Sequence, residues 1–219
     1  MTVRLSGPML PARSGTPKQL MVLLHGYGAD GRDLISLGIQ WRELWPDMLF
    51  VAPNAPEACA LGQGFQWFPV DPDRRVETWR TGPVLTAPVL VNFLTDVWAQ
   101  TGIAAADTVL VGFSQGTMMA LHVGTALPER LAAIVGFSGS FSPAAGFAEG
   151  KFAKPPVALI HGDSDTMVEP GASRDAAEVL TASGFDVSLH FSAGVGHGIA
   201  PDGLDFATAF LLSQIAAKA

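Results

Sequence analysis

The sequence predicts an α/β protein with a mostly parallel central sheet and helices on both faces. Short apolar runs alternate with longer segments of helical spacing along most of the chain. Several of these runs are apolar without interruption, which is typical of strands buried on both faces of a parallel sheet. Only 15% of the residues are charged and 48% are hydrophobic, so many segments can be fully buried.

Length and charge limit the functional classes. The chain has 219 residues and no repeat or linker, so we expect a single domain over residues 1–219. Its net charge of −7 argues against a nucleic acid partner. We expect neither a signal peptide nor an integral membrane segment, because no apolar run approaches the roughly 18–20 residues that span a bilayer. The single cysteine, Cys59, cannot form an internal disulfide and fits a cytoplasmic location.

The first clear strand is the apolar run Leu20–His25, which Gly26 stops. A short edge strand is expected before it, around Val3–Leu5. The later segments are predicted as helix 33–44, strand 48–52, helix 84–102, strand 107–112, helix 115–127, strand 131–137, strand 156–161, helix 171–183, strand 185–192 and helix 204–217. Apolar and polar residues alternate in strand 185–192, which indicates a position near the sheet edge.

Residues 53–83 contain five prolines and no clear element. Such a long irregular segment more often forms a binding loop or lid than a passive connection. Its aromatic residues point to the same role, although they could instead pin the loop to the body of the protein: Phe65, Trp67, Phe68 and Trp79. Cys59 lies in the same segment, and nothing in the sequence activates its thiol.

The segment Val109–Ala120 runs from a strand through a G-x-S-x-G turn into a helix, with Ser114 at the bend. A serine in such a turn adopts a strained backbone conformation, and Gly112 and Gly116 supply the room that it needs. The turn presents the hydroxyl as a nucleophile. Alone, the pattern could equally be a glycine-rich connection between a strand and a helix.

A serine nucleophile needs a base, usually a histidine oriented by a carboxylate. His122 lies too far along the helix that follows Ser114, and His190 lies on the polar side of its strand. His161 would precede the acid in the chain. His197 remains, in a glycine-rich loop beyond the last strand where its side chain can reach the strand ends.

The acid should follow the strand that ends at His161, where both Asp163 and Asp165 are candidates. Ligands of open parallel sheets lie at the carboxyl ends of the strands, which favours the longer reach of Asp165. Asp163 is better placed to stabilise the turn. His161 and the two aspartates could also suggest a metal site, but nothing completes a ligand set, and we expect no metal.

Acyl transfer also requires two donors for the oxyanion of the tetrahedral intermediate. One is the N–H of Gln115 at the start of the helix after Ser114. The other is the N–H of Tyr27, because Gly26 and Gly28 on either side let the backbone approach closely. This loop lacks the Lys-Ser/Thr ending of a phosphate-binding loop.

Four blocks in this order resemble the phospholipase/carboxylesterase family of α/β-hydrolases, which includes small bacterial carboxylesterases and acyl-protein thioesterases. They are Leu24–Gly28, Gly112–Gly116, His161–Asp165 followed by Val168, and Gly196–Gly198. The segments Pro53–Pro56 and Gln66–Phe68 are similar to the segment before the family's substrate loop.

The resemblance implies an α/β-hydrolase fold without a large cap domain and without a cofactor. It implies a triad of Ser114, Asp165 and His197, with an oxyanion hole from the N–H groups of Tyr27 and Gln115. The sequence departs from the family at Tyr27, where thioesterases usually carry leucine, and at Trp67-Phe-Pro69, where many members have Trp-Phe-Asp. These departures leave the acyl group open. Our candidates for the walls of the acyl pocket are Phe65, Trp67, Met118 and Phe141.

The leading hypothesis is a serine carboxylesterase that acts on small-molecule esters of short to medium acyl chains. A second hypothesis keeps the triad but assigns a lysophospholipid, an acyl-protein thioester or a lactone as substrate. A third, from another class, is a non-catalytic binding module on the same fold. The predicted edge strands and the aromatic-rich loop also leave room for a homodimer.

Overall fold

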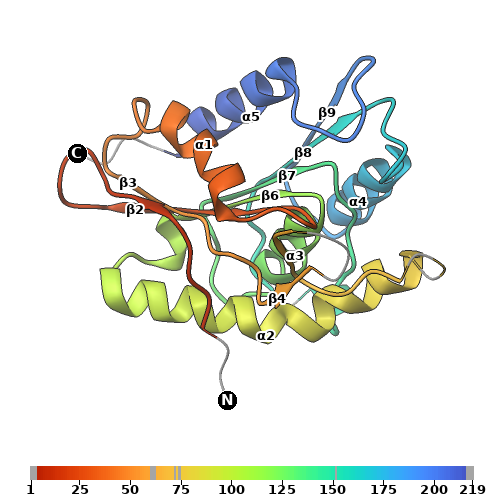
Figure 1. Cartoon of the computed structure of the whole chain (residues 1–219), viewed down its shortest axis with the longest axis horizontal. Coiled ribbons are helices and arrows are strands. Elements are labelled where there is room, and N and C mark those ends of the chain that lie inside the picture. The colour runs from red at the N-terminus through yellow and green to blue at the C-terminus, as the bar shows by residue number, and fades with distance from the viewer. Residues whose placement is uncertain (1–3, 60–62, 72, 74, 151, 216–219) are drawn as a thin grey trace.

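In a computed structural model that describes residues 4–59, 63–71, 73, 75–150 and 152–215, the described residues form a seven-stranded sheet of order β1-β3-β2-β6-β7-β8-β9 and a separate two-stranded hairpin, β4-β5 (Figure 1). The strands are β1 (Met9–Leu10), β2 (Gln19–Leu24), β3 (Met48–Val51), β4 (Glu57–Ala58), β5 (Phe65–Gln66), β6 (Thr108–Phe113), β7 (Ala133–Phe137), β8 (Val157–Gly162) and β9 (Val187–Ser192). The helices are α1 (Gly31–Trp41), α2 (Arg75–Thr101), α3 (Gln115–Gly124), α4 (Gly171–Ala182) and α5 (Pro201–Gln214). All neighbouring strands of the large sheet are parallel except β1, which is antiparallel to β3.

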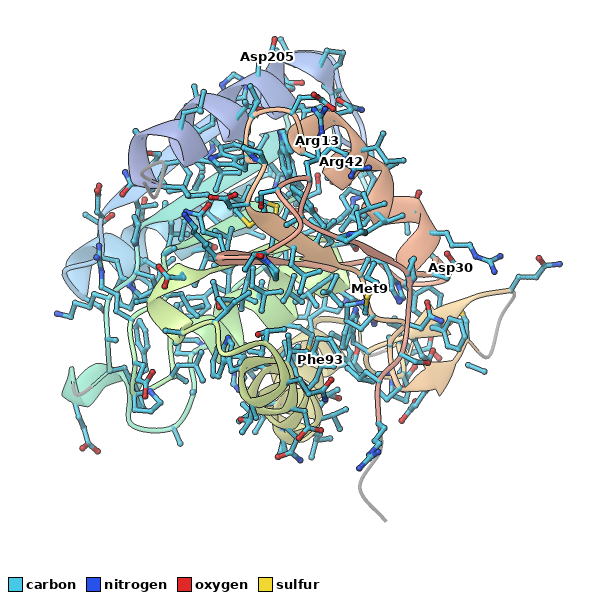
Figure 2. All side chains as sticks on the ribbon, turned by 90° about the vertical axis from the view of Figure 1, so that its left-hand side faces the viewer. Met9, Arg13, Asp30, Arg42, Phe93 and Asp205 are labelled. Carbon is cyan, nitrogen blue, oxygen red and sulfur yellow. The ribbon has the colours of Figure 1, made fainter. Side chains whose placement is uncertain are left out.

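The sheet separates two apolar cores. Strands β2, β7 and β8 are buried along their whole length, as expected of uninterrupted apolar runs. Side chains on one face pack with α2, α3 and α4, and those on the other face pack with α1 and α5. Figure 2 shows these layers from the side, with Asp205 of α5 above the sheet and Phe93 of α2 below it. The predicted fold class is therefore confirmed.

Most predicted elements are confirmed with shifts of a few residues at their ends. Strand β9 lies at the edge of the sheet, as its alternating pattern indicated. The predicted edge strand at 3–5 is wrong. Residues 4 and 5 are not in a strand, residue 3 lies outside the described part, and the antiparallel edge strand is formed by Met9 and Leu10. The last helix begins at Pro201 and ends at Gln214, and residues 216 and 217 of the prediction also lie outside the described part.

The described part of segment 53–83 contains more regular structure than predicted. It contains the hairpin β4-β5, and α2 begins at Arg75 instead of residue 84. Pro83, which falls in the segment predicted to be irregular, and Pro88 both lie inside this helix. The helix continues through them because Leu90 and Leu94 are fully buried and because Gly82 lies directly against the ring of Phe68. Tertiary packing has overridden local preference.

Helix α2 differs from the sequence expectation in another respect. By length and composition it is apolar enough to cross a bilayer, since the span Val76–Thr101 reaches a mean hydropathy of 1.2. In the structure it forms the outer layer beside α3, as Figure 1 shows. Leu90 and Leu94 face the sheet core, so the apolar composition of this helix is partly explained by packing.

We predict that Trp41→Ala lowers the free energy of unfolding by about 3–5 kcal/mol in urea titrations. Trp41 is 2% exposed, and its indole N–H donates a 2.8 Å hydrogen bond to Thr208 Oγ1, which ties α1 to α5. The control is Ile39→Ala on the same helix. Ile39 is 58% exposed, so this variant should change stability by no more than about 0.5 kcal/mol. Equal effects of the two substitutions would contradict the assignment of this core.

Candidate active site

The turn at Ser114 has the strained geometry that its sequence predicted. Ser114 has φ 54° and ψ −117° and connects β6 directly to α3. A side chain on Gly116 would overlap the carbonyl group of Leu24, and one on Gly112 would overlap the backbone of Gly116. The N–H of Ser114 donates to the carbonyl of Phe137 at 2.9 Å. Close contacts with β2 and β7 therefore hold a conformation that costs of order 1–3 kcal/mol.

Asp165 and His197 meet above the carboxyl end of β8. His197 Nδ1 lies 2.7 Å from Asp165 Oδ2, and the Asp165 side chain has no exposed surface. The other carboxylate oxygen accepts hydrogen bonds from the N–H groups of Met167 at 2.8 Å and Val168 at 3.1 Å. Burial alone would raise the pKa of Asp165, but the hydrogen bonds from His197, Val168 and Met167 outweigh it and lower this pKa below its ordinary value. Asp165 is therefore a carboxylate that orients His197.

Asp163, the alternative acid, binds the backbone of the loop that carries His197. Its Oδ1 accepts a 2.7 Å hydrogen bond from the N–H of Gly194. The N–H of Ser164 donates to the carbonyl of Val195 at 2.9 Å, and a side chain on Gly162 would overlap the same carbonyl. The loop thus rests directly on the end of β8. The structure brings Asp165 to His197 and places Asp163 under the loop that carries it.

Ser114 and His197 both lie on loops at the carboxyl ends of the parallel strands, Ser114 after β6 and His197 after β9. The ring of Phe113, the residue before Ser114, lies 4.9 Å from the ring of His197, measured between centroids. The His197 side chain is 21% exposed, so a substrate can reach it. Among the described residues, Ser114 Oγ has no hydrogen bond to His197. Catalytic hydrogen bonds of this kind often tighten only when substrate binds.

The predicted oxyanion loop is held by the hairpin β4-β5. The N–H of Gly28 donates to the carbonyl of Phe65 at 2.9 Å, and the N–H of Phe65 donates to Ala29 at 2.8 Å. Gln115 is the first residue of α3, so its N–H has no acceptor within the helix. The Tyr27 side chain is hydrogen-bonded to Cys59, which raises the pKa of Tyr27. Cys59 is buried, and its contact with Tyr27 gives it a packing role at this loop.

The side chain of Gln115 was not identified as functional from the sequence. Its Oε1 accepts a 3.0 Å hydrogen bond from the N–H of Trp67, and its Nε2 donates to the carbonyl of Phe68 at 2.8 Å. The indole N–H of Trp67 donates to the carbonyl of His25 at 2.9 Å. Gln115 therefore joins the serine turn to the segment between β5 and α2. The available signal was a long polar side chain in a turn whose other residues are small or apolar.

The four predicted acyl-pocket residues separate into two groups. Trp67 is 0% exposed and Met118 is 1% exposed, so both belong to the apolar core and present no surface to a substrate. Phe65 is half-buried and acts through its backbone bonds to the oxyanion loop. Phe141 is half-buried and lines a cavity. The pattern of large apolar residues could not distinguish a pocket wall from the core beneath it.

Two open cavities lie beside the site. The first, of about 590 Å³, lies between the N-terminal part of α2, the loop after β7 and the loop that carries Asp165. Its apolar walls are Val76, Trp79, Phe141 and Met167. The second, of about 520 Å³, lies between α1 and the start of α5 and includes Phe113 and Gly198. Its polar walls are Asp33, Ser36 and Gln40.

Comparison with known proteins gives a consistent result. The model of the family described as Phospholipase/Carboxylesterase matches residues 8–215. Esterase YpfH of Escherichia coli (strain K12) is 30% identical over 193 residues, which cover 87% of this chain and 80% of that protein. Acyl-protein thioesterase 1 of Gibberella zeae is 28% identical over 216 residues, with 90% and 91% covered. The crystal structure of esterase PE8 is 55% identical, has a TM-score of 0.93 and covers 97% of this chain and 100% of its own.

We predict that Asp165→Asn lowers kcat for ester hydrolysis by about 10⁴-fold, because an amide favours the wrong tautomer of His197. Asp163→Asn, the matched control, should lower kcat less than about tenfold, since Asp163 contacts only the loop backbone and Ser164. Circular dichroism of both variants should show a native fold. A larger loss for the Asp163 variant would contradict the assignment of the acid.

The pKa of Asp165 also predicts a pH dependence of stability. Because it is lowered on folding from an ordinary value of 3.8, the unfolded chain takes up the proton first. The stabilisation is therefore complete above about pH 4 and is lost as the pH falls towards the folded pKa. Urea unfolding should be measured for the wild type and Asp165→Asn between pH 7 and pH 3. The difference between their free energies of unfolding should become smaller as the pH falls. If this difference in the free energy of unfolding became larger as the pH fell, the pKa of Asp165 would be raised on folding and the prediction would be wrong.

Proposed function

The chain belongs to the phospholipase/carboxylesterase family of hydrolases, and we propose that it is a serine carboxylesterase that forms its acyl-enzyme on Ser114. The observation that carries this proposal is the 2.7 Å hydrogen bond between a buried Asp165 and His197, beside a serine held in a strained turn. The G-x-S-x-G turn places this serine between the end of β6 and the start of α3, which is where an α/β-hydrolase presents its nucleophile.

The proposed reaction has two steps. Ser114 Oγ attacks the acyl carbonyl while His197 Nε2 takes its proton, and the N–H groups of Tyr27 and Gln115 stabilise the oxyanion. Asp165 stabilises the imidazolium, which then gives the proton to the alcohol as the ester bond breaks. Water attacks the acyl-enzyme with His197 again as base, and the carboxylic acid leaves.

We assign the acyl chain to the cavity beside α2. Some of its walls come from the loops after β7 and β8. It therefore opens at the carboxyl ends of the strands, where Ser114 also lies. Met167, two residues after the acid, is 53% exposed, and Val76 is 77% exposed. Exposed apolar side chains around an open cavity of about 590 Å³ suit a short to medium acyl chain.

We assign the alcohol to the cavity beside α1. His197 must protonate the leaving oxygen, so the alcohol has to lie on the side of the histidine loop. This cavity begins at Gly198 and at Phe113, whose ring contacts His197. Its walls include the polar side chains of Asp33 and Ser36, which suit an alcohol that carries hydroxyl groups.

An acyl-protein thioester or a lysophospholipid is the alternative substrate for the same triad. The similarity to the Gibberella zeae thioesterase supports it. So does the open form of the acyl cavity, where the exposed residue Val76 leaves room for a longer acyl chain to extend outwards. For the protein as a whole, we further propose a cytoplasmic location, and a homodimer through edge strand β9, where Leu189 is 37% exposed.

The test is a panel of aryl esters of increasing acyl length with one common alcohol, compared with matched thioesters and a lysophospholipid. We expect kcat/KM to be highest for short to medium esters. A fluorophosphonate should label the wild type and leave Ser114→Ala unlabelled, with activity reduced by about 10⁶-fold and the fold retained.

Each result of this panel is informative. Faster turnover of long-chain thioesters or of the lysophospholipid would replace the proposed substrate and keep the triad. Failure to hydrolyse any ester, together with an unlabelled serine, would contradict both candidate reactions and favour a binding module. A Ser138→Ala variant is the control for labelling, because Ser138 also has a positive φ, 48°, but is only 1% exposed.

A further inference from the structure

His161 lies next to the acid but has no part in the reaction proposed above. It is the fifth residue of β8, and its side chain is completely buried. Its Nε2 lies 3.2 Å from Asp165 Oδ2 and 2.9 Å from the carbonyl oxygen of Val168. Its Nδ1 lies 2.7 Å from Ser173 Oγ on α4. Two histidines therefore contact the same carboxylate oxygen of Asp165.

These partners determine the tautomer of His161. A carboxylate oxygen and a carbonyl oxygen can only accept, so Nε2 must carry the proton that both share. Nδ1 is then the acceptor, and the hydroxyl of Ser173 donates to it. Ser173 is 2% exposed, so water does not compete for this bond. The resulting order of donors runs from Ser173 through His161 to Asp165, which also accepts a hydrogen bond from His197 Nδ1–H.

The charge of His161 also matters. Burial lowers the pKa of His161, and the hydrogen bonds to Val168 and Asp165 only partly oppose this. The ionisable groups that act on it are Asp165 and His197, and its partner on α4, Ser173, is neutral. A neutral donor fixes the carboxylate without cancelling its charge. A protonated His161 would instead neutralise Asp165 and weaken its support for the imidazolium of His197.

We propose that His161 is a positioning residue of the catalytic site, which as the neutral Nε2–H tautomer holds Asp165 Oδ2 in place for His197. Ser173 sets this tautomer from α4. Val168 completes the arrangement, because its carbonyl accepts from His161 while its N–H donates to Asp165 Oδ1 at 3.1 Å. The inference rests on the proposed triad and extends it by two residues that do not touch the substrate.

The wild-type protein provides the first test. Two-bond ¹H–¹⁵N correlation spectra of the imidazole rings should show His161 as the neutral Nε2–H tautomer throughout the pH range in which kcat/KM rises. His161→Gln and His190→Gln spectra assign the signals, since His190 lies at the exposed edge and pairs with Asp202. An Nδ1–H tautomer, or a ring that becomes protonated together with the loss of activity, would overturn the proposal.

Variants provide the second test. His161→Leu removes the donor, and we expect kcat to fall about 10- to 100-fold with little change in KM. The acid limb of the kcat/KM profile should move up by about half a pH unit, because the unshared carboxylate oxygen binds the imidazolium more strongly. His161→Gln keeps a donor at the Nε2 position and should recover most of kcat. Ser173→Ala leaves the contact between His161 and Asp165 in place. It should therefore move the acid limb in the same direction as His161→Leu does, but by a smaller amount.

The control for burial is His122→Gln. His122 is 4% exposed and bonds the carbonyl of Ser142 at 2.6 Å, away from Asp165. This variant should lower the melting temperature without moving the acid limb. The proposal would be overturned if the acid limb of the kcat/KM profile of His161→Leu did not move or moved to lower pH. It would also be overturned if His122→Gln moved the acid limb as far as His161→Leu does. The proposed function fails separately, through active Ser114→Ala or Asp165→Asn enzymes.

Discussion

The strained turn at Ser114 is the constraint on which the rest of the site depends. A residue with φ 54° between a strand and a helix is stable only if its surroundings leave it no alternative. Here the helix after it lies so close to the end of β2 that Gly116 has room for no side chain. The bond from Ser114 to Phe137 fixes the other side. The cost of the turn is thus offset by the packing of β2, β6 and β7. The loops after β2 and β6 carry the expected oxyanion donors, and the loops after β8 and β9 carry Asp165 and His197.

The two aspartates after β8 divide one task. Asp165 holds the ring of His197, and Asp163 holds the backbone of the loop that carries this ring. The base therefore has its orientation and its position fixed by different groups from one turn. This division explains why two acidic residues occur so close together.

The sequence predicted the layered fold well, because uninterrupted apolar runs such as β2 have few alternatives to a buried parallel strand. It also placed Ser114 and His197 in glycine-rich turns that follow strands, although the pattern at Ser114 alone did not distinguish a nucleophile from a simple connection. It failed where tertiary contacts decide. Helix α2 continues through Pro83 because Gly82 packs against Phe68. The local sequence does not predict this contact. It likewise could not tell that Trp67 lies beneath the site and not at its surface, since burial depends on the neighbours that folding brings together.

Gln115 serves the proposed reaction with its backbone and the substrate segment with its side chain. Its N–H is the expected oxyanion donor, while its amide group binds Trp67 and Phe68, which lead into the helix lining the acyl cavity. Mutations that reshape this cavity will therefore strain a residue that also serves rate acceleration. Directed evolution towards bulkier acyl groups should accordingly show a trade-off between selectivity and turnover, and its successful lineages should first change cavity residues that do not bond this amide, such as Val76.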